Sequence, residues 1–380
     1  MTRTSTAIWE RIAAQLPLPL TVIDIGARGG VEDHWSQFGT AIRLYGFEPD
    51  ETECDRLNHR DDRVATYIPL ALGSSTSEQR FYVTKDPFCS SLFPPCDELV
   101  RERPRLTEMS VQEVTTIQTQ TIDDWASEYD IGDLDHMKID AQGAELAILE
   151  GAVRSLGSVR SLNLEVQFSR LYEGTPLFGD IDRFLRERGF VLWRLGELSH
   201  CGFDNASANF EVPEIFNYDS RRVDVSTGGG QLLWANAYYV RQETARPSQR
   251  IDWSDAIRDA CLARAHRYAD LAEVCLRRSL PEAPDGARSI VRTALASSST
   301  FGPPLMDPMK DMQALVDELK RAADERLALA DELKQAADER LALINELQEV
   351  ATARLRALEA AQAQLRARDA ELEQLRARSA

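Results

Sequence analysis

The chain has 380 residues, of which 43% are hydrophobic. A chain of this length is longer than one compact domain of ordinary size, which indicates a main domain with appendages. The formal net charge of −18 excludes a surface built to follow a nucleic-acid backbone or an anionic lipid layer, because both need cationic partners.

Residues 1 to about 245 alternate short β-rich runs with helical stretches such as 144–156 and 178–188. The expected strands are residues 21–25, 42–48, 65–71, 79–84, 115–120, 136–139, 161–166, 190–195 and 232–240. Alternation of this kind predicts a doubly wound, mostly parallel sheet with helices on both faces. The last run follows a long irregular segment, so we expect it to add an antiparallel strand beside the sheet.

The first expected strand runs into a glycine-rich turn. Its sequence, residues 21–30, is TVIDIGARGG. Glycines let the backbone pass close to a ligand and adopt dihedral angles that other residues avoid. Doubly wound folds bind nucleotides at such turns, at the carboxyl ends of their strands.

The second expected strand ends in Glu48, about twenty residues after the turn. A carboxylate at this place accepts hydrogen bonds from the two hydroxyls of a ribose. Arg28 occupies the middle glycine position of a dinucleotide fingerprint, and Asp24 adds a negative charge beside the turn. The pattern therefore favours S-adenosylmethionine, which has a ribose and two cationic groups but no phosphate, over a nicotinamide dinucleotide.

A third motif, HMKIDAQGAELAILEG over residues 136–151, places Asp140 at a strand end and Glu145 at the start of a helix. In a doubly wound sheet this strand lies next to the first one, so both carboxylates are expected to face the bound cofactor. Glu165 ends a further strand at the same edge. These three residues are the candidate catalytic bases, although Asp140 also suits a helix cap. The three carboxylates together could also bind a divalent cation, and the spacing of carboxylates in a sequence does not decide between the two roles.

The rest of the chain is helical in pattern. Residues 252–280 have apolar side chains at helical spacing, and a proline-rich segment follows.

Residues 309–380 contain neither glycine nor proline, and the fourteen-residue segment 318–331 repeats almost unchanged as 332–345. Two heptads make up this repeat, which predicts a coiled coil that pairs with a second copy or with a partner helix. The alternative is a solvated single helix with many ion pairs. The predicted parts are therefore 1–245, 246–296, 297–308 (linker) and 309–380 (coiled coil).

The segment MKIDAQGAEL, residues 137–146, closely resembles the K-I-D-x-Q-G-x-E motif of FkbM-family methyltransferases. The turn that contains Asp24 and Gly30 resembles the family's cofactor loop, and residues 47–49 resemble its acidic motif. Further similar segments lie at 70–73, 90–92, 121–123, 171–174 and 188–190, so the resemblance covers roughly residues 20–240.

This resemblance implies a class I, Rossmann-like methyltransferase with a seven-stranded sheet that transfers a methyl group from S-adenosylmethionine to a hydroxyl of a sugar, glycan or related small molecule. It implies that the cofactor is bound by Asp24, Gly26, Ala27, Arg28, Gly30 and Glu48, without a metal. The competing hypotheses are a non-catalytic scaffold that assembles partners through the coil and a nicotinamide-dependent oxidoreductase.

The sequence also predicts where the protein works. Residues 1–10 lack the apolar stretch of a secretory signal, and no apolar run is long enough to span a bilayer. The six cysteines are scattered without a C-x-x-C pair, which predicts reduced thiols and no zinc site. We therefore expect a cytoplasmic enzyme without a nucleic-acid partner. Its acceptor pocket is expected to include residues 201–222.

Overall fold

The computed structural model describes residues 3–60, 65–202, 212–218, 221–227, 229–246, 248–297 and 300–301, and eight positions between 340 and 368. The chain divides into two compact units, Met1–Pro304 and Leu305–Ala380. The eight described positions of the second unit are helical. The other residues of the predicted coiled coil lie outside the described residues, so pairing of this segment stays a prediction.

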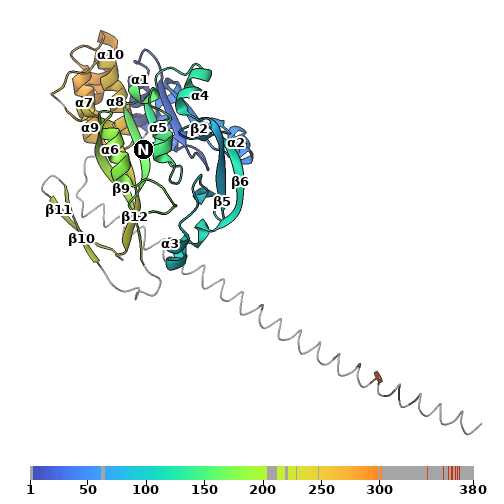
Figure 1. The fold of residues 1–380 in the computed structure, drawn as a ribbon. Helices are drawn as coiled ribbons and strands as arrows, with labels where there is room; N and C mark the ends of the chain where they lie inside the picture. Colours follow the sequence, from blue (N-terminus) through green and yellow to red (C-terminus); the bar gives the residue numbers. More distant parts are fainter. Residues whose placement is uncertain are drawn as a thin grey trace, which may run out of the picture. The chain divides into compact units, whose positions relative to one another are not determined.

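A seven-stranded sheet forms the centre of the first unit, in the order β3-β2-β1-β7-β8-β12-β9 (Figure 1). The strands are β1 (Leu20–Ile25), β2 (Ile42–Phe47), β3 (Thr66–Ile68), β7 (His136–Ile139), β8 (Ser161–Gln167), β9 (Phe190–Cys201) and β12 (Gln231–Arg241). Five of these strands pair with one another in parallel: β3, β2, β1, β7 and β8. The predicted doubly wound, mostly parallel sheet is therefore confirmed. The last strand is antiparallel, as expected, but it lies inside the sheet, between β8 and β9.

Two smaller sheets stand apart from this main sheet. Strands β4 (Ala71–Leu72), β6 (Val111–Gln120) and β5 (Ser77–Thr84) form one of them, and β10 (Val212–Tyr218) pairs with β11 (Arg221–Thr227) in the other. The sequence runs at 79–84 and 115–120 were predicted as strands without a place in a particular sheet, and they belong to the first of these smaller sheets. Most side chains of β6 are exposed, whereas a central parallel strand is buried on both faces.

Helices cover both faces of the main sheet. One face packs against α1 (Arg3–Ala13), the 3₁₀ segment η1 (Asp33–Ala41), α2 (Glu51–Asn58), and the three helices α8 (Trp253–Ala265), α9 (Ala269–Ser279) and α10 (Asp285–Ala296). The other face packs against α4 (Ile122–Glu128), α5 (Glu145–Glu150) and α6 (Phe178–Arg186). Alternate residues of a strand serve the two faces: in β1, Val22 belongs to the first core and Ile23 to the second.

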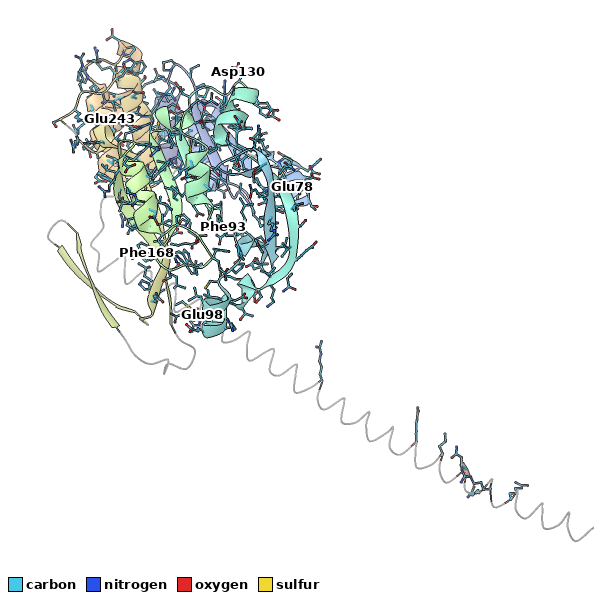
Figure 2. The ribbon with its side chains drawn as sticks, viewed as in Figure 1. Glu78, Phe93, Glu98, Asp130, Phe168 and Glu243 are labelled. Carbon is cyan, nitrogen blue, oxygen red and sulfur yellow. The ribbon has the colours of Figure 1, made fainter. Side chains whose placement is uncertain are left out.

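Short elements complete the first unit: α3 (Asp97–Glu102), α7 (Gln242–Ala245), η2 (Pro87–Cys89), η3 (Pro104–Met109) and η4 (Ser155–Gly157). Charged side chains such as Glu78, Glu98 and Asp130 lie on the outer surface of this unit (Figure 2). No helix within the described ranges combines the length and the apolar character that crossing a membrane would require.

The continuous helical pattern at 252–280 is broken in the structure. Helix α8 ends at Ala265, and Arg267 has a φ of 63°, a left-handed conformation that stops a helix. Almost every side chain of α8 from Ala256 onward is buried, which is typical of a helix inside a core. Figure 1 shows α8, α9 and α10 grouped beside α1, so they pack as part of the first unit.

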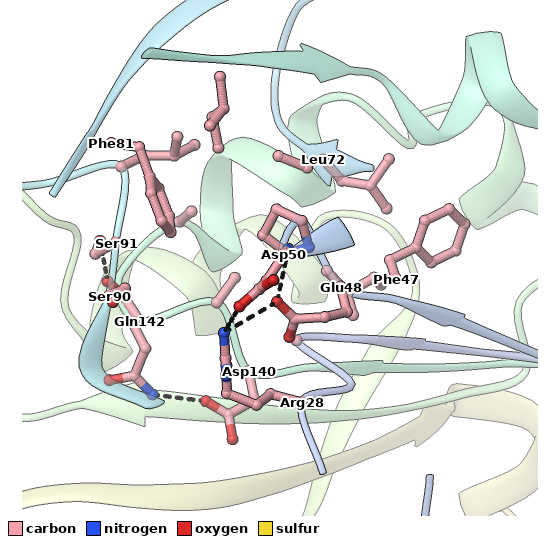
Figure 3. A pocket seen from close by; sticks show the side chains of 18 of the residues that line it. Arg28, Phe47, Glu48, Asp50, Leu72, Phe81, Ser90, Ser91, Asp140 and Gln142 are labelled. Carbon is pink, nitrogen blue, oxygen red and sulfur yellow. Dashed lines mark hydrogen bonds and ion pairs between the residues drawn. The ribbon is translucent and has the colours of Figure 1, made fainter. Parts of the chain in front are cut away.

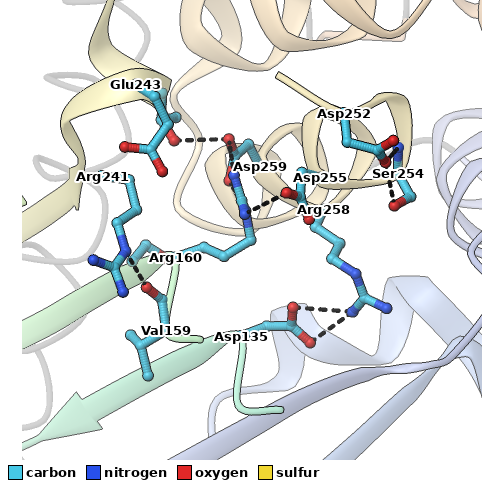
Figure 4. Close-up of polar contacts among 12 residues, drawn as sticks. Asp135, Val159, Arg160, Arg241, Glu243, Asp252, Ser254, Asp255, Arg258 and Asp259 are labelled. Atoms are coloured by element: carbon cyan, nitrogen blue, oxygen red, sulfur yellow. Dashed lines mark hydrogen bonds and ion pairs between the residues drawn. The ribbon is translucent and has the colours of Figure 1, made fainter. Parts of the chain in front are cut away.

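Buried ion pairs join α8 to the amino-terminal ends of β7 and β8 (Figure 4). Both nitrogens Nε and Nη2 of Arg160 donate to the carboxylate of Asp259, which also accepts a hydrogen bond from Thr244 at 2.7 Å. Arg258 binds Asp135 with nitrogen–oxygen distances of 2.8 and 2.9 Å. Arg160 and Asp259 are 8% and 3% exposed, so each charge depends on its partner.

Replacement of Asp259 by alanine is expected to lower the free energy of unfolding by about 3 kcal/mol, because it leaves the buried Arg160 guanidinium with only Asp255 as a partner. Urea denaturation at pH 7 measures this change. Asp285→Ala, which removes the exposed partner of Arg288, is the control and should leave the unfolding curve unchanged. Equal effects of the two variants would contradict the prediction.

Candidate active site

A cavity of about 370 Å³ opens at the carboxyl ends of β1, β2 and β7, between the main sheet and the β4-β6-β5 sheet (Figure 3). Its polar lining is formed by Arg28, Glu48, Asp50, Ser90, Ser91, Asp140 and Gln142. Its apolar lining includes Ile25, Phe47, Leu70, Leu72, Phe81, Val83, Phe88, Leu92, Ile117 and Ile148. The motifs singled out in the sequence thus meet at one site, at the sheet edge where doubly wound folds bind their ligands.

The glycine turn is held against the neighbouring strand by its own backbone. The N–H groups of Gly26 and Ala27 both donate to the Phe47 carbonyl oxygen, at 3.1 and 3.0 Å. Gly26 has a φ of 81°, and a Cβ on this residue would lie 1.9 Å from the Asp140 carbonyl oxygen. Only glycine therefore lets β1 and β7 end this close together. The Gly29 N–H donates to Glu53 of α2 at 3.0 Å, which fixes the far end of the turn.

Glu48 follows β2 and lies at the floor of the cavity. Its Oε1 accepts the Asp50 N–H at 2.9 Å, and its Oε2 makes no hydrogen bond with any described residue. Glu48 is 4% exposed, and this burial raises the pKa of its carboxyl group, although the Asp50 N–H opposes the rise. Arg28 binds Asp50 at 2.6 Å and lies 3.8 Å from Glu48. One oxygen of Glu48 is thus left for a ligand's hydroxyl groups.

Asp24 lies behind this site and does not line the cavity. Its carboxylate is 3% exposed and lies 3.0 Å from the Lys138 ammonium group. Burial raises the pKa of Asp24, and the attraction of Lys138 opposes that rise. Ala27 and Gly30 also lie outside the lining: Ala27 is buried in the first core, and Gly30 faces Tyr67 and Leu57.

Asp140 follows β7 and faces the cavity. Its Oδ1 accepts a hydrogen bond from the Gln142 carboxamide at 2.8 Å, and its Oδ2 has no hydrogen-bond partner within the described part of the chain. Asp140 does not cap α5: the described cap of that helix has no side-chain hydrogen bond. Its carboxylate is therefore placed to act on a molecule in the cavity.

Glu145 and Glu165 lie near Asp140 in different surroundings. The Oε1 atom of Glu145 accepts the N–H groups of Ala141 and Gly143, so this carboxylate holds the turn after β7. Burial raises the pKa of Glu145 to about 7 and that of Glu165 well above its usual range, and the negative charge of Asp140 adds to both rises. Within the described ranges, no three His, Cys, Asp or Glu side chains are arranged to hold a metal ion.

His34 is a structural residue in its surroundings. Its Nδ1 lies 2.8 Å from Glu32, and its ring packs against Trp35 and His266. It does not line the cavity. Three residues to which the sequence assigned no role contribute more to the site: Gln142, Tyr172 and Ser91. Each lies in a segment that resembles the family, at 137–146, 171–174 or 90–92, but their contacts with one another arise only through the fold.

The fold and this cavity define a nucleotide-binding α/β enzyme, and comparison with known proteins gives the family. Residues 24–192 match the family described as the methyltransferase FkbM domain. Hexuronic acid methyltransferase AglP of Haloferax volcanii is 25% identical over 179 residues, which cover 45% of this chain and 69% of that protein. The 2-O-methyltransferase NoeI of Sinorhizobium fredii is 25% identical over 187 residues, which cover 47% of this chain and 76% of that protein.

Solved structures similar to this chain include two bacterial methyltransferases. One is the precorrin-6y C5,15-methyltransferase of Geobacter metallireducens, with 14% identity, a TM-score of 0.27, and coverage of 60% of this chain and 86% of that one. The other is the TehB-like SAM-dependent methyltransferase of Corynebacterium glutamicum, with 12% identity, a TM-score of 0.28, and coverage of 62% and 87%.

Over residues 24–192 the chain has an FkbM methyltransferase domain. It is an S-adenosylmethionine-dependent methyltransferase, as the resemblance of its motifs implied. The cavity suits this cofactor, because the backbone of Gly26 lines it and because the unused oxygen of Glu48 suits a ribose diol.

Proposed function

We propose that this protein transfers the methyl group of S-adenosylmethionine to a hydroxyl oxygen of a sugar or glycan. One observation carries the proposal: the glycine turn, Glu48 and Asp140, from the ends of three neighbouring strands, line a single cavity. The names of two relatives support the acceptor class, since one is a hexuronic acid methyltransferase and the other a 2-O-methyltransferase.

In this proposal the cofactor is held by Gly26, Arg28 and Glu48. Glu48 accepts the ribose hydroxyls, Gly26 lines the cavity with its backbone, and Arg28 orients the two carboxylates beside it. Three further residues of the turn lie outside the cavity lining and fix the shape of the turn: Asp24, Ala27 and Gly30. Asp24 also neutralises Lys138, which keeps that buried ammonium group from repelling a cationic cofactor.

The cofactor supplies an activated methyl group with a neutral leaving group, so the protein mainly positions the acceptor oxygen in line with it. The acceptor hydroxyl must also lose its proton. Asp140 is the proposed general base, because its Oδ2 faces the cavity without a hydrogen-bond partner among the described residues. Glu145 holds the turn that carries Asp140, and Glu165 adds negative charge beside it.

The charge of the site favours a neutral hydroxyl over a carboxylate as the methylated group. Asp140, Glu165 and Glu145 gather on one side of the site, and Lys138 is already paired with Asp24. An acidic acceptor group would add a further negative charge to these carboxyl groups, whose burial and mutual repulsion already raise the pKa of Glu145 and of Glu165. The product is therefore expected to be a methyl ether, which survives mild alkali, and not a methyl ester, which does not.

The remaining proposals concern the parts outside the site. We propose that residues 309–380 form the coiled coil and pair with a second copy or a partner helix, that the linker spans 297–308, and that the enzyme works in the cytoplasm. The segment expected to shape the acceptor pocket, 201–222, lies largely outside the described residues.

Calorimetric titration with S-adenosylhomocysteine tests the cofactor site. Glu48→Ala should weaken binding about 100-fold, because two hydrogen bonds to a buried carboxylate are lost. Glu78→Ala, which removes an exposed carboxylate of β5, is the control and should bind like the wild type.

Incubation of the wild type with labelled S-adenosylmethionine and neutral oligosaccharides then tests the acceptor. Equal affinity of the Glu48 variant, or label released by mild alkali, would refute the corresponding part of the proposal.

A further inference from the structure

Gln142 has an unusual backbone conformation within the turn after β7. Its φ is 53°, in the left-handed region that side chains other than glycine and asparagine rarely adopt. Such a conformation costs free energy and persists where surrounding contacts fix it. Here the Ser91 hydroxyl donates to the Gln142 carbonyl oxygen at 2.7 Å, and Glu145 binds the N–H groups on both sides of the residue. The turn therefore presents the Gln142 side chain in one direction.

The carboxamide of Gln142 connects three elements of the site. Its nitrogen donates to Asp140 Oδ1 at 2.8 Å (Figure 3), and its oxygen accepts from the Tyr172 hydroxyl at 2.7 Å. The Tyr172 oxygen also lies 2.9 Å from the Cys89 carbonyl oxygen, so its one proton is shared between two acceptors. A carboxamide turned by 180° would place its oxygen against the Asp140 carboxylate. Tyr172 thus fixes which end of the carboxamide faces Asp140.

The same carboxamide acts on Glu165, whose pKa it lowers. Burial raises the pKa of Glu165, the charges of Asp140 and Glu145 raise it further, and Lys138 and Gln142 lower it. The titratable groups near this cluster come from several elements: Asp140 and Lys138 from β7 and its turn, Glu145 from α5, Glu165 from β8, and Cys89 and Tyr172 from the adjoining loops. Among these described residues, Gln142 is thus the neutral side chain that acts on both Asp140 and Glu165.

We propose that Gln142 is a positioning residue: its carboxamide, oriented by Tyr172, holds the Asp140 carboxylate beside Glu165 and aims Asp140 Oδ2 at the acceptor. The part that concerns the acceptor rests on the proposed role of Asp140 as the base. The contact itself does not depend on that role, so it can be tested without an acceptor.

The first test compares the pH dependence of stability for the wild type and Gln142→Met, which keeps the size and shape of the side chain. The folded-state pKa of Glu165 lies above its unfolded value, so its contribution to stability is full at low pH and is lost as pH rises toward the folded-state pKa. Loss of the Gln142 donor raises that pKa further. The unfolding constant of the variant relative to wild type should therefore increase as the pH rises through the folded-state pKa of Glu165.

Gln37→Met is the control, since the Gln37 carboxamide donates to a backbone carbonyl group of η1 and to no carboxylate among the described residues. Its effect should be the same at every pH. A pH-independent effect of Gln142→Met would show that the residue only fills space and would overturn the proposal.

The second test measures methyl transfer to a neutral oligosaccharide that the wild type accepts. Gln142→Met should lower kcat about 100-fold, because a misplaced base costs this much, and should leave the affinity for S-adenosylhomocysteine unchanged. An unchanged kcat would overturn the positioning role. If the wild type methylates no such acceptor, the proposed function fails, whereas the stability test still decides whether Gln142 acts on this group of carboxyl side chains.

Discussion

Gly26→Ala is expected to abolish cofactor binding at micromolar S-adenosylhomocysteine and to destabilise the first unit by about 4 kcal/mol. The new Cβ would lie 1.9 Å from the carbonyl oxygen of Asp140, which is a backbone atom and cannot turn aside. Alanine is also strained at a φ of 81°. Strain of this kind and overpacking each cost about 1–3 kcal/mol. Because β1 and β7 must move apart, Gly26 and Asp140 lose their common position.

Calorimetry and thermal unfolding followed by circular dichroism measure these two effects. The control is Gly132→Ala: a Cβ at Gly132 meets no atom within 4 Å, and its backbone has no positive φ. This control should bind S-adenosylhomocysteine and unfold like the wild type. If Gly26→Ala also did so, the close approach of the two strand ends would not be needed for the site.

Asp140→Asn is expected to lower kcat about 10²–10⁴-fold and to leave S-adenosylhomocysteine binding almost unchanged. Asparagine has the same shape and still offers an oxygen to the Gln142 carboxamide, but it cannot accept the proton of an acceptor hydroxyl. Rates of methyl transfer and calorimetric titration with S-adenosylhomocysteine measure these two effects.

Asp130→Asn provides the control, because Asp130 is exposed and, at a φ of 50°, also in the left-handed region. It should have wild-type kinetics. A rate for Asp140→Asn within tenfold of wild type would place the base elsewhere, and Glu165 would be the next residue to test.

The strand ends that carry the site were predictable from the sequence. The expected strand at 136–139 matches β7 residue for residue, and those at 21–25 and 42–48 differ from β1 and β2 by one residue at one end. Buried parallel strands are short apolar runs, so their carboxyl ends are marked by the first polar residue or glycine. This is why Gly26, Glu48 and Asp140 could be expected at one edge of the sheet before their positions were known.

The parts that were not predictable depend on contacts between distant residues. Asp24 had the pattern of a cofactor ligand, but the fold pairs it with Lys138, 114 residues away. The segments that form β5 and β6 have the composition of sheet strands, and only the fold shows that they belong to a separate sheet that lines the cavity. Gln142 and Tyr172 meet across 30 residues. Local patterns carry no information about such partners.

The place of β12 also determines when the protein can fold during its synthesis. Strand β9 pairs only with β12 in the main sheet, and β12 begins at Gln231, thirty residues after β9 ends. A nascent chain that has not yet released β12 from the ribosome therefore exposes unpaired edges on both β8 and β9, which are prone to pair with other chains. Helices α8 to α10 are made later still, and they cover the first core. Folding of the catalytic unit is thus delayed until about 300 residues have been made, and a chaperone that shields open strand edges would serve this protein most during that interval.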